Sequence, residues 1–472
     1  MADRAGRFVI TRRRFIQGTA ATILLAGCGG SDDGNGGGSE AGAAGAPAET
    51  FSEPSQRLSG ELKILLWSHF VPRHDKWFDR FAADWGEKVG VKVTVDHIEV
   101  TTIPARLEAE ISARSGHDLA QFIGPLPQLE PSVIDLADVT KEATRRFGAQ
   151  IDICRRSSLN PTTNRYYAYS PSWVPDPGNY RKSMWTAVGL PNGPTTWEEL
   201  REGGKEIKAS KKVPVGIGMS QEIDSNMAGR ALLWSYGGAI QDENENVILD
   251  SPETVAAVEY MSGLFKDAMT NEVFAWNPAS NNQALVAGKL SYIINSISAY
   301  RTMQQVNPRV AEDVFFVPAL KGPKDDVAAQ HVMYNWLVPE HAKNPDAAQE
   351  FLLHYTENFA RATWESELYD FPAFKKLSPD LPKWLDDDPF GSKPADKLSV
   401  LKDALEWTTN VGHRGSANTA IGEVFGTFLI PNMYARAARG RATAQQAVAR
   451  AEGQIKPIFD KWRKRGLIGG TA

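Results

Sequence analysis

Apolar runs of strand length alternate with amphipathic, helix-like segments early in the chain, and this alternation limits the fold more than any other feature. The strand-like runs are residues 61–67, 91–100 and 118–124, and helical periodicity covers residues 76–90 and 102–116 between them. Because strands separated by helices usually pair in parallel, the pattern predicts an α/β fold with helices on the faces of a sheet. Ligands of such sheets bind at the carboxyl ends of the strands.

The alternation resumes after an extended segment in the middle of the chain. Residues 166–180 contain too many prolines for a helix and predict an extended crossing between two halves, the first hinge. Beyond it, Thr195 or Thr196 is placed to cap a helix. The last helical segment contains Pro457, which predicts a kink or a break there. A chain of 472 residues is long enough for two domains.

The first residues have the composition of an export signal. Arg12 and Arg13 precede a thin apolar run that ends at Cys28, and paired arginines are typical of a twin-arginine signal. The small residues before Cys28 resemble a bacterial lipobox, in which the cysteine is acylated, and the run is too short and interrupted to span a membrane. We therefore expect an exported lipoprotein anchored to the outer face of the cytoplasmic membrane. Its signal peptide would be residues 1–27, followed by a flexible Gly- and Ala-rich tether over residues 28–58.

Charge and cysteine content limit the partners of the chain. The formal net charge is -5, and removal of residues 1–27, whose charges are mostly arginines, makes it more negative. This balance argues against nucleic acid or an anionic bilayer as the main partner. With Cys28 lipidated, Cys154 has no intramolecular partner, so we expect it in the core as a small apolar residue.

One stretch has part of the spacing of a calcium loop. Asp242, Asn244, Asn246 and Glu253 occupy its first, third, fifth and twelfth positions, but Val247 stands where the sharp turn needs glycine. A polar turn before a helix explains the stretch more simply, and we expect no metal site.

Short catalytic motifs are absent from the sequence. There is no G-x-S-x-G, no H-E-x-x-H and no cluster of Cys and His at metal-ligand spacing. A glycoside hydrolase remains an alternative because its two carboxylates have no short signature. We expect a binding protein without a cofactor.

Five blocks of sequence occur in an order that resembles a known family. They are residues 117–140, 166–200, 231–261, 284–295 and 338–356, within a region of similarity that covers nearly all of residues 62–462. Together they resemble the extracellular solute-binding proteins of ABC importers, in particular the carbohydrate-binding group related to maltose-binding protein. The resemblance implies three partners: a small-molecule solute, expected to be a sugar; the membrane subunits of an ABC permease; and the membrane itself, through the lipid on Cys28. It also implies a monomer that binds no nucleic acid.

The fold implied by this resemblance is an α/β, two-lobed periplasmic-binding-protein fold of type II. Its lobes are discontinuous in sequence and are joined by a hinge, with the ligand cleft between them. The implied limits are residues 59–168 and 318–360 for lobe 1, and residues 169–317 and 361–472 for lobe 2.

The sequence departs from the family pattern at three places that bear on the ligand, one of which is residues 179–182 (NYRK) in place of its Tyr-Asn-Lys strand. Residues 295–298 (NSIS) stand where the family usually has Asp-Gly-Pro-Trp, and Tyr334 stands at the tryptophan of its Gly-Gly-Trp-Gly block. A carbohydrate remains the expected ligand, and a polyol, a glycerol phosphodiester or a polyamine is the alternative. A phosphodiester would use Arg414 and His69, whereas a polyamine would need several carboxylates in the cleft.

Candidate ligand-binding residues follow from these matched positions. A sugar presents hydroxyl groups at its edge and an apolar C–H face, so its site needs aromatic rings beside polar side chains. Each aromatic candidate could instead be a core residue, and Arg414 could form a surface ion pair. The candidates are Trp67, His69 and Phe122 in lobe 1; Tyr169, Ser172 and Trp173 near the hinge; Trp276, Asn295 and Tyr334 around the cleft; and, in second rank, Trp407 and Arg414.

Overall fold

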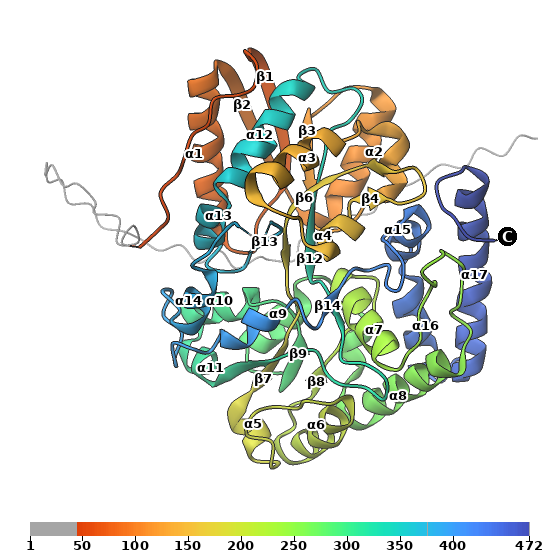
Figure 1. Ribbon diagram of the computed structural model, residues 1–472. Coiled ribbons are helices and arrows are strands. Elements are labelled where there is room, and N and C mark those ends of the chain that lie inside the picture. Colours follow the sequence, from red (N-terminus) through yellow and green to blue (C-terminus); the bar gives the residue numbers. More distant parts are fainter. Residues whose placement is uncertain (1–44, 375, 472) are drawn as a thin grey trace, which may run out of the picture. The chain divides into compact units, whose positions relative to one another are not determined.

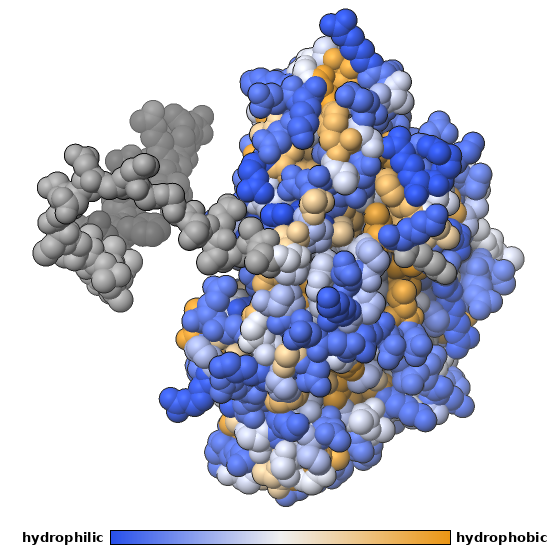
Figure 2. Space-filling view, turned by 60° about the vertical axis from the view of Figure 1, so that its left-hand side comes forward, coloured by the Kyte–Doolittle hydropathy of each residue, from blue (hydrophilic) through white to orange (hydrophobic). Residues whose placement is uncertain are grey.

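The computed structural model describes residues 45–374 and 376–471, in which two β-sheets are each covered by helices (Figure 1). The expected export signal, with Arg12, Arg13 and Cys28, lies outside the described residues. None of the helices within the described part of the chain is long and apolar enough to cross a membrane. The face seen in Figure 2 carries mainly hydrophilic residues, with apolar residues scattered between them.

The first sheet has six strands in the order β13-β6-β12-β3-β1-β2. β1 pairs in parallel with β2 and β3, as the alternation predicted, whereas β12 runs antiparallel to β3 and β6. β13 adds an antiparallel edge strand to β6. The bounds are β1 Gly60–Trp67, β2 Val91–Ile98, β3 Leu119–Phe122, β6 Tyr169–Val174, β12 Val332–Leu337 and β13 Phe371–Pro372.

The helices that cover the faces of the first sheet come from two separate parts of the chain, residues 72–156 and residues 345–365. α1 ends at Gly90, whose φ of 76° is in the left-handed region that favours glycine. The buried face of α1 packs on α12, where the ring of Phe81 stacks on His354 at a centroid distance of 4.7 Å. The helices are α1 Pro72–Val89, α2 Ile103–Ala113, α3 Ala137–Phe147, α4 Asp152–Arg156, α12 Pro345–Glu357 and α13 Phe359–Glu365, with 3-10 turns η1 Val100–Thr102 and η2 Pro127–Ser132; a short hairpin joins β4 Leu159–Asn160 to β5 Arg165–Tyr166.

The second sheet has four strands in the order β10-β7-β9-β8. β7 is antiparallel to both of its neighbours, and β8 pairs with β9 in parallel. The strands are β7 Gly178–Arg181, β8 Val215–Gly216, β9 Tyr292–Ile294 and β10 Val314–Val317. The associated helices are α5 Lys182–Thr186, α6 Trp197–Lys211, α7 Ile223–Ser235, α8 Pro252–Ala268, α9 Ser280–Val286, α10 Ser298–Val306 and α11 Pro308–Asp313, with the 3-10 turn η3 Asn271–Phe274.

The C-terminal part of the chain adds helices beside the second sheet. α16 and α17 pack on one another and on α8. A two-stranded parallel ladder pairs β11, which directly precedes β12 in the sequence, with β14, which precedes these helices. The elements are β11 Ala328–Ala329, α14 Leu381–Asp386, η4 Ser399–Asp403, β14 Thr408–Thr409, α15 Thr419–Gly426, α16 Leu429–Ala438 and α17 Ala444–Lys464.

Three local expectations can be compared directly with the structure. Thr196, and not Thr195, is the N-cap of α6, where it forms a capping box with Glu199. α17 continues through Pro457 as one helix, so the expected break does not occur. Cys154 is fully buried, as expected, and burial raises the pKa of its thiol.

The structure places the lobe limits differently from the expected ones. β6 was expected to begin lobe 2 but belongs to the first sheet, and so does β13, which was expected late in lobe 2. α13 also packs on α1 of the first lobe. The reason is that both strands join the sheet through antiparallel pairing with partners far away in sequence, which local periodicity does not reveal.

The last part of the expected tether is packed against the first lobe. The backbone N–H of Thr50 donates to Asn358 at 2.6 Å, and Ser52 donates to Glu357 at 2.5 Å. Trp77 of α1 donates its indole N–H to Glu49 at 2.8 Å. Although residues 46–58 are mostly polar, hydrogen bonds to side chains of α1 and of the end of α12 therefore hold them on the first lobe.

Candidate functional site

Two segments of the chain pass between the sheets next to one another, and their side chains form a pair. Residues 175–177 join β6 to β7, and residues 330–331 join β11 to β12. The backbone N–H of His331 donates to the carbonyl of Val174 at 2.8 Å. The Nδ1 atom of His331 lies 3.0 Å from a carboxylate oxygen of Asp176, and both side chains are buried. The pair thus ties the two crossing segments together.

A group of amide and carboxylate side chains from the second lobe lies beside this pair. Asp224, in the first turn of α7, accepts hydrogen bonds from the amides of Asn281 at 2.7 Å and Asn295 at 3.3 Å. The Asn295 amide also donates to Asn282 at 2.6 Å. Glu222 caps α7 by accepting from the backbone N–H groups of Asp224 and Ser225. We call Asp176, Asp224, Asn281, Asn295 and His331 the junction cluster.

Burial and neighbouring charges shift the pKa values in the junction cluster. Burial raises the pKa of Asp224 to about 6, where His331 opposes the shift and Asp176 adds to it. Burial lowers the pKa of His331, but the carboxylates of Asp176 and Asp224 outweigh burial and leave that pKa above its ordinary value. Burial also raises the pKa of Glu222 well above its ordinary value, and Asp224 adds to this effect. The charge of the junction cluster therefore changes near neutral pH.

A second set of titratable groups lies at the end of the first sheet. The Tyr334 hydroxyl donates to Asp370 at 2.7 Å, and His69 lies 3.2 Å from that hydroxyl and 3.4 Å from the carboxylate. The ring of His74 stacks on His69 at 4.4 Å. Burial favours a high pKa for Asp370, but His69 and the hydrogen bonds outweigh burial and lower it. We call His69, His74, Tyr334 and Asp370 the lobe 1 cluster.

Tyr369 lies between the two clusters. Its ring meets that of His69 edge-on, with 5.2 Å between ring centroids. Burial raises its pKa well above the ordinary value, the nearby Ser296 hydroxyl opposes this shift, and the carboxylates of Asp370, Asp224 and Asp176 add to it. The Tyr369 hydroxyl therefore faces charged groups of both clusters.

Several buried polar atoms around the crossing segments have no hydrogen-bond partner within the described residues. Leaving such an atom unpaired costs about 1–3 kcal/mol, so these atoms are suited to bind a polar ligand. They are the hydroxyls of Ser172 and Tyr369, both polar atoms of the Gln330 side chain, the indole nitrogen of Trp407 and the amide nitrogen of Asn410.

A cavity of about 460 Å³ opens beside the N-terminus of α7. The first lobe contributes Phe122, Ile123 and residues of η1 and α2 to its lining, and the second lobe contributes Glu222 and Phe425 among others. Its volume is within the range of small-molecule sites, about 300–1,000 Å³. The lining is mainly apolar, with Glu108 and Glu222 as its carboxylates.

Most of the residues singled out from the sequence lie in or next to this region. His69 and Tyr334 belong to the lobe 1 cluster, and Asn295 belongs to the junction cluster. Phe122 lines the cavity. The remaining three are Ser172 and Trp173, in the half of β6 that leads to the first crossing, and Trp67, which stacks behind Tyr334 at 6.1 Å between ring centroids.

Four others lie farther from the clusters. Tyr169 is in the core of the first lobe, where its hydroxyl lies 2.6 Å from that of Thr356. Arg414 is exposed and donates to the carbonyl of Gly237 at 2.9 Å. Trp276 is half-buried against β8 of the second sheet. Trp407 is buried beside the second crossing segment, where its carbonyl accepts from the Ala328 backbone at 2.8 Å.

The sequence did not single out the acidic members of the clusters, nor His74 and His331. Asp176 lies between two prolines of the crossing segment, and this position was a usable signal because a buried carboxylate there needs a partner. His331, Asp224, Tyr369 and Asp370 gave no comparable signal because their partners are distant in sequence.

The possible calcium loop has its carboxylate engaged internally. Asp242 accepts from the backbone N–H groups of Asn244 at 2.8 Å and Asn246 at 2.9 Å, and from the Asn246 amide. Among the described residues, no group of three or more His, Cys, Asp or Glu side chains is arranged to hold a metal ion. The arrangement matches a polar turn.

Solved structures with the same architecture are two-lobed binding proteins. The maltose-bound MalE3 protein of T. maritima matches with a TM-score of 0.69 and 17% identity over 84% of this chain and 100% of that chain. A sugar transporter protein of Arthrobacter chlorophenolicus A6 with bound laminaribiose gives 0.71 and 16% over 84% and 99%. A solute-binding protein of Agrobacterium radiobacter K84 in complex with ribitol gives 0.69 and 18% over 86% and 100%. The expected α/β, two-lobed fold is thereby confirmed.

Similarity in sequence to curated proteins covers a smaller part of the chain. A binding protein of Brucella abortus (strain 2308) is 23% identical over 175 residues, which is 37% of this chain. A binding protein of Brucella suis biovar 1 (strain 1330) matches to the same extent. The chain spans 42% of the length of these curated relatives.

A family model matches a longer region that contains both crossing segments. It is the model of the bacterial extracellular solute-binding protein family, and it covers residues 76–390. This is more than half of the chain, and it includes the junction cluster, Tyr334 and Asp370 of the lobe 1 cluster, and the strands β2 and β3. The chain belongs to the bacterial extracellular solute-binding proteins.

Proposed function

We propose that the protein is a receptor for a neutral, hydroxyl-rich solute, a mono- or oligosaccharide, which it delivers to the permease of an ABC importer. The observation that carries this proposal is the meeting of aromatic rings and unpaired polar atoms between the lobes. Tyr369 and Trp173 supply rings, and Ser172 and Gln330 supply buried atoms that a sugar hydroxyl can satisfy. Maltose and laminaribiose are bound by proteins of the same fold.

The proposal includes a polyol as the ligand, because the hydroxyl groups of a polyol would form the same hydrogen bonds as those of a sugar. Ribitol is bound by one of the structural neighbours. A glycerol phosphodiester has less support, since Arg414 lies on the surface and Asp224, Asp176 and Asp370 would repel a phosphate.

A polyamine is a second candidate because the clusters contain more carboxylates than the sequence suggested. Asp176 and Asp370 are already paired with His331 and His69, however, and Asp224 is engaged by two amides. A cationic ligand would have to replace these partners, which favours the neutral ligand.

Closure of the lobes on the ligand is the proposed mechanism. The open form exchanges solute, and closure is favoured by the difference in ligand affinity between the open and closed states. We propose no catalysis, so the ligand leaves unchanged. Incubation with oligosaccharides followed by chromatography tests this point, and the appearance of shorter products would contradict it.

The ligand class is tested by a thermal-shift screen over sugars, polyols, polyamines and phosphodiesters. A ligand that binds the folded state raises Tm. At a free ligand concentration of a hundred times Kd, it adds about 2.7 kcal/mol to the free energy of unfolding. A shift with sugars or polyols alone supports the proposal. A shift with polyamines alone, or with none of the four classes, contradicts it.

The anchor and the export route also remain proposals. A lipid on Cys28 would keep the receptor at the outer face of the cytoplasmic membrane, and the twin-arginine form implies export of the folded chain. Replacing Arg12 and Arg13 by lysine should abolish export, which fractionation measures. Normal export of this variant would point to the general secretory route instead.

A further inference from the structure

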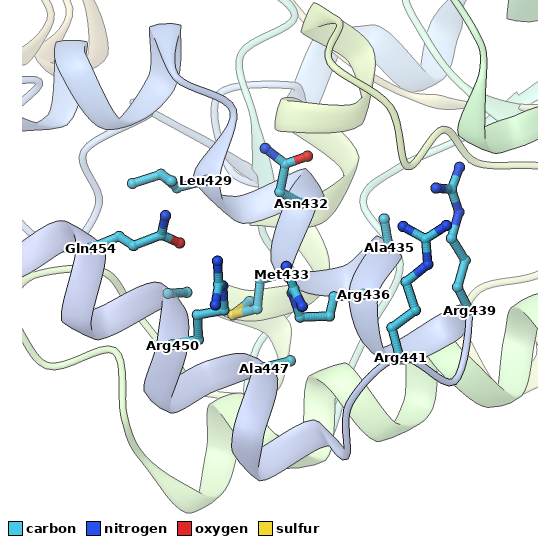
Figure 3. A pocket seen from close by; sticks show the side chains of 11 residues that line it. Leu429, Asn432, Met433, Ala435, Arg436, Arg439, Arg441, Ala447, Arg450 and Gln454 are labelled. Atoms are coloured by element: carbon cyan, nitrogen blue, oxygen red, sulfur yellow. The ribbon is translucent and has the colours of Figure 1, made fainter.

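A pocket between α16 and α17, remote in sequence from the crossing segments, is rich in arginine. Its volume is about 200 Å³, and its lining includes Arg436, Arg439, Arg441 and Arg450 (Figure 3). The floor contains Leu429 and Met433 of α16 and small alanines of α17. The lining has no Asp or Glu side chain. We call these four arginines and the floor between them the arginine pocket.

The backbone fixes the three arginines at the end of α16. Gly440 has a φ of 67°, in the left-handed region, and the chain turns back there. The N–H of Arg441 donates to the carbonyl of Arg436 at 3.0 Å, and the N–H of Gly440 donates to that of Ala437 at 2.8 Å. Arg450 approaches from the facing helix α17, whose start is fixed by a capping box at Thr443.

Within the described part of the chain, none of these four arginines has a carboxylate oxygen within 4.0 Å. The nearby acid of α17, Glu452, is paired with Lys456. Arg439 is partly held by the ring of Phe274, 4.1 Å from the guanidinium carbon, and by its carbonyl at 3.4 Å. Four positive charges without a carboxylate partner repel one another in this small pocket. The chain as a whole has a net charge of -5, so the pocket is a positively charged region on a negatively charged protein.

We infer that the arginine pocket binds a phosphate group carried by a small molecule or a lipid headgroup. The planar guanidinium has five N–H donors in a fixed fork, which matches the oxygens of a phosphate better than a lysine ammonium does. Forks from two helices can hold one tetrahedral group from opposite sides, whereas a carboxylate offers only two oxygens in a plane. The volume suits such a group and is below the usual range for a whole sugar-sized ligand.

This site is independent of the proposed solute cleft. The arginine pocket shares none of its lining residues with the cavity beside α7. Binding of a sugar should therefore be unaffected by the variants below, and loss of phosphate binding would leave the proposed function intact.

The test compares two double variants that lose the same charge. R436Q/R450Q removes one arginine from each helix of the pocket, and R57Q/R309Q removes two exposed arginines elsewhere that also have no carboxylate within 4.0 Å. Both are prepared with Cys28→Ser, so that no acyl chain contributes. Titration calorimetry measures binding of inorganic phosphate and glycerol 3-phosphate at about 50 mM NaCl, and flotation measures binding to phosphatidylglycerol vesicles.

We expect saturable binding of at least one of these probes, weakened at least tenfold in R436Q/R450Q and unchanged in R57Q/R309Q. Binding to the soluble probes identifies a small phosphoester as the source, and binding to vesicles alone identifies the lipid headgroup. Absence of binding to all probes, or equal weakening in the two double variants, overturns the inference.

A third variant separates fork geometry from charge and guards against a folding defect. R436K/R450K keeps both charges but loses the guanidinium forks. Its melting temperature should equal that of the parent while its affinity falls by about fivefold or more. Affinity equal to that of the parent would overturn the assignment of a phosphate held by forks.

Discussion

The lobe 1 cluster and the junction cluster use the same chemistry, a buried aspartate beside a histidine, in two different mechanical settings. Asp370, His69 and Tyr334 are all attached to the first sheet. Asp176 and His331 lie instead on the two crossing segments, and their neighbour Asp224 belongs to the second lobe. The lobe 1 cluster can therefore stay intact while the lobes move, whereas the junction cluster has to respond to that motion.

The pKa values of the two aspartates, Asp370 and Asp224, are shifted in opposite directions. Asp370 has its pKa lowered by a donor hydroxyl and a histidine that outweigh burial. Asp224 receives only amide donors, and burial raises its pKa to about 6. Buried carboxylates in one protein are thus tuned in opposite directions by the donors that surround them. We expect the lobe 1 cluster to contribute stability and the junction cluster to contribute to ligand binding.

The largest effect is expected from Asp370→Ala. It removes the acceptor of the Tyr334 hydroxyl and the buried carboxylate that lies beside His69 and His74, so the free energy of unfolding should fall by about 3–5 kcal/mol. Urea denaturation measures this loss. Asp79→Ala, which breaks an exposed pair with His97, is the control and should cost at most about 1 kcal/mol. Equal losses in the two variants would remove the stabilising role of the lobe 1 cluster.

The pH dependence of stability should separate the two aspartates by sign. Asp224 binds its proton more tightly in the folded state, so its contribution to stability falls as pH rises from about 4 to about 6, by roughly 1.4 kcal/mol per unit. Asp370 has a lowered pKa, so its contribution is present above the pKa of the unfolded chain and is lost as pH falls through its folded pKa.

Asp224→Asn and Asp370→Asn make this contrast measurable. As the pH rises from about 4 to about 6, the stability of Asp224→Asn should increase relative to that of the wild type. The reason is that the variant has no buried carboxyl group whose ionisation is unfavourable in the folded state. Asp370→Asn should lose stability relative to the wild type at neutral pH and lose less at acid pH. Denaturation curves at several pH values provide the readout, and parallel profiles for all three proteins would contradict the assignments.

A smaller effect, on ligand affinity, is expected from Asp176→Asn. The amide keeps the shape but no longer holds the charged form of His331, so the tie between the crossing segments weakens. We expect about tenfold weaker binding of the solute found in the thermal-shift screen, which corresponds to about 1.4 kcal/mol. Calorimetry measures it. A normal affinity together with a large loss of stability would contradict this prediction, because the junction cluster would then contribute to stability, as the lobe 1 cluster does.

The smallest effect is expected from Tyr369→Phe, which removes one hydroxyl between the clusters. Because this hydroxyl has no partner within the described residues, its loss should leave stability nearly unchanged and weaken solute binding by about three- to tenfold. Tyr236→Phe, at a half-buried position of the second lobe, is the matched control. Unchanged affinity in Tyr369→Phe would exclude this hydroxyl from the site.

Local pattern was sufficient for the elements that form from neighbouring residues. The alternation over residues 61–124 predicted the parallel core of the first sheet, and the polar residue before Trp197 predicted the cap of α6. It was not sufficient for the edges of the sheets. β13 has only two residues, and its place beside β6 depends on pairing with Ser172 and Trp173, about 200 positions earlier.

The same distinction applies to the candidate site. His69 and Phe122 were visible in the sequence because the strand ends beside them are themselves visible, and Tyr334 was visible because it matches a position of the family pattern. Asp224 and Asp370 were not, because a carboxylate in a helix or loop is normally solvated and only the folded structure shows that it is buried. Tyr169 matched the family pattern but packs in the core, which shows that a matched aromatic residue can serve packing alone.

The segment of residues 46–58 that lies along α12 determines how a force on the anchor would reach the receptor. A pull from the N-terminal side would act first on α1 through the hydrogen bond between Trp77 and Glu49, and then on the hydrogen bonds of Thr50 and Ser52 to the end of α12. These contacts all belong to the first lobe. The load would therefore pass into one rigid sheet and bypass the crossing segments, so that a receptor under tension could still open and close.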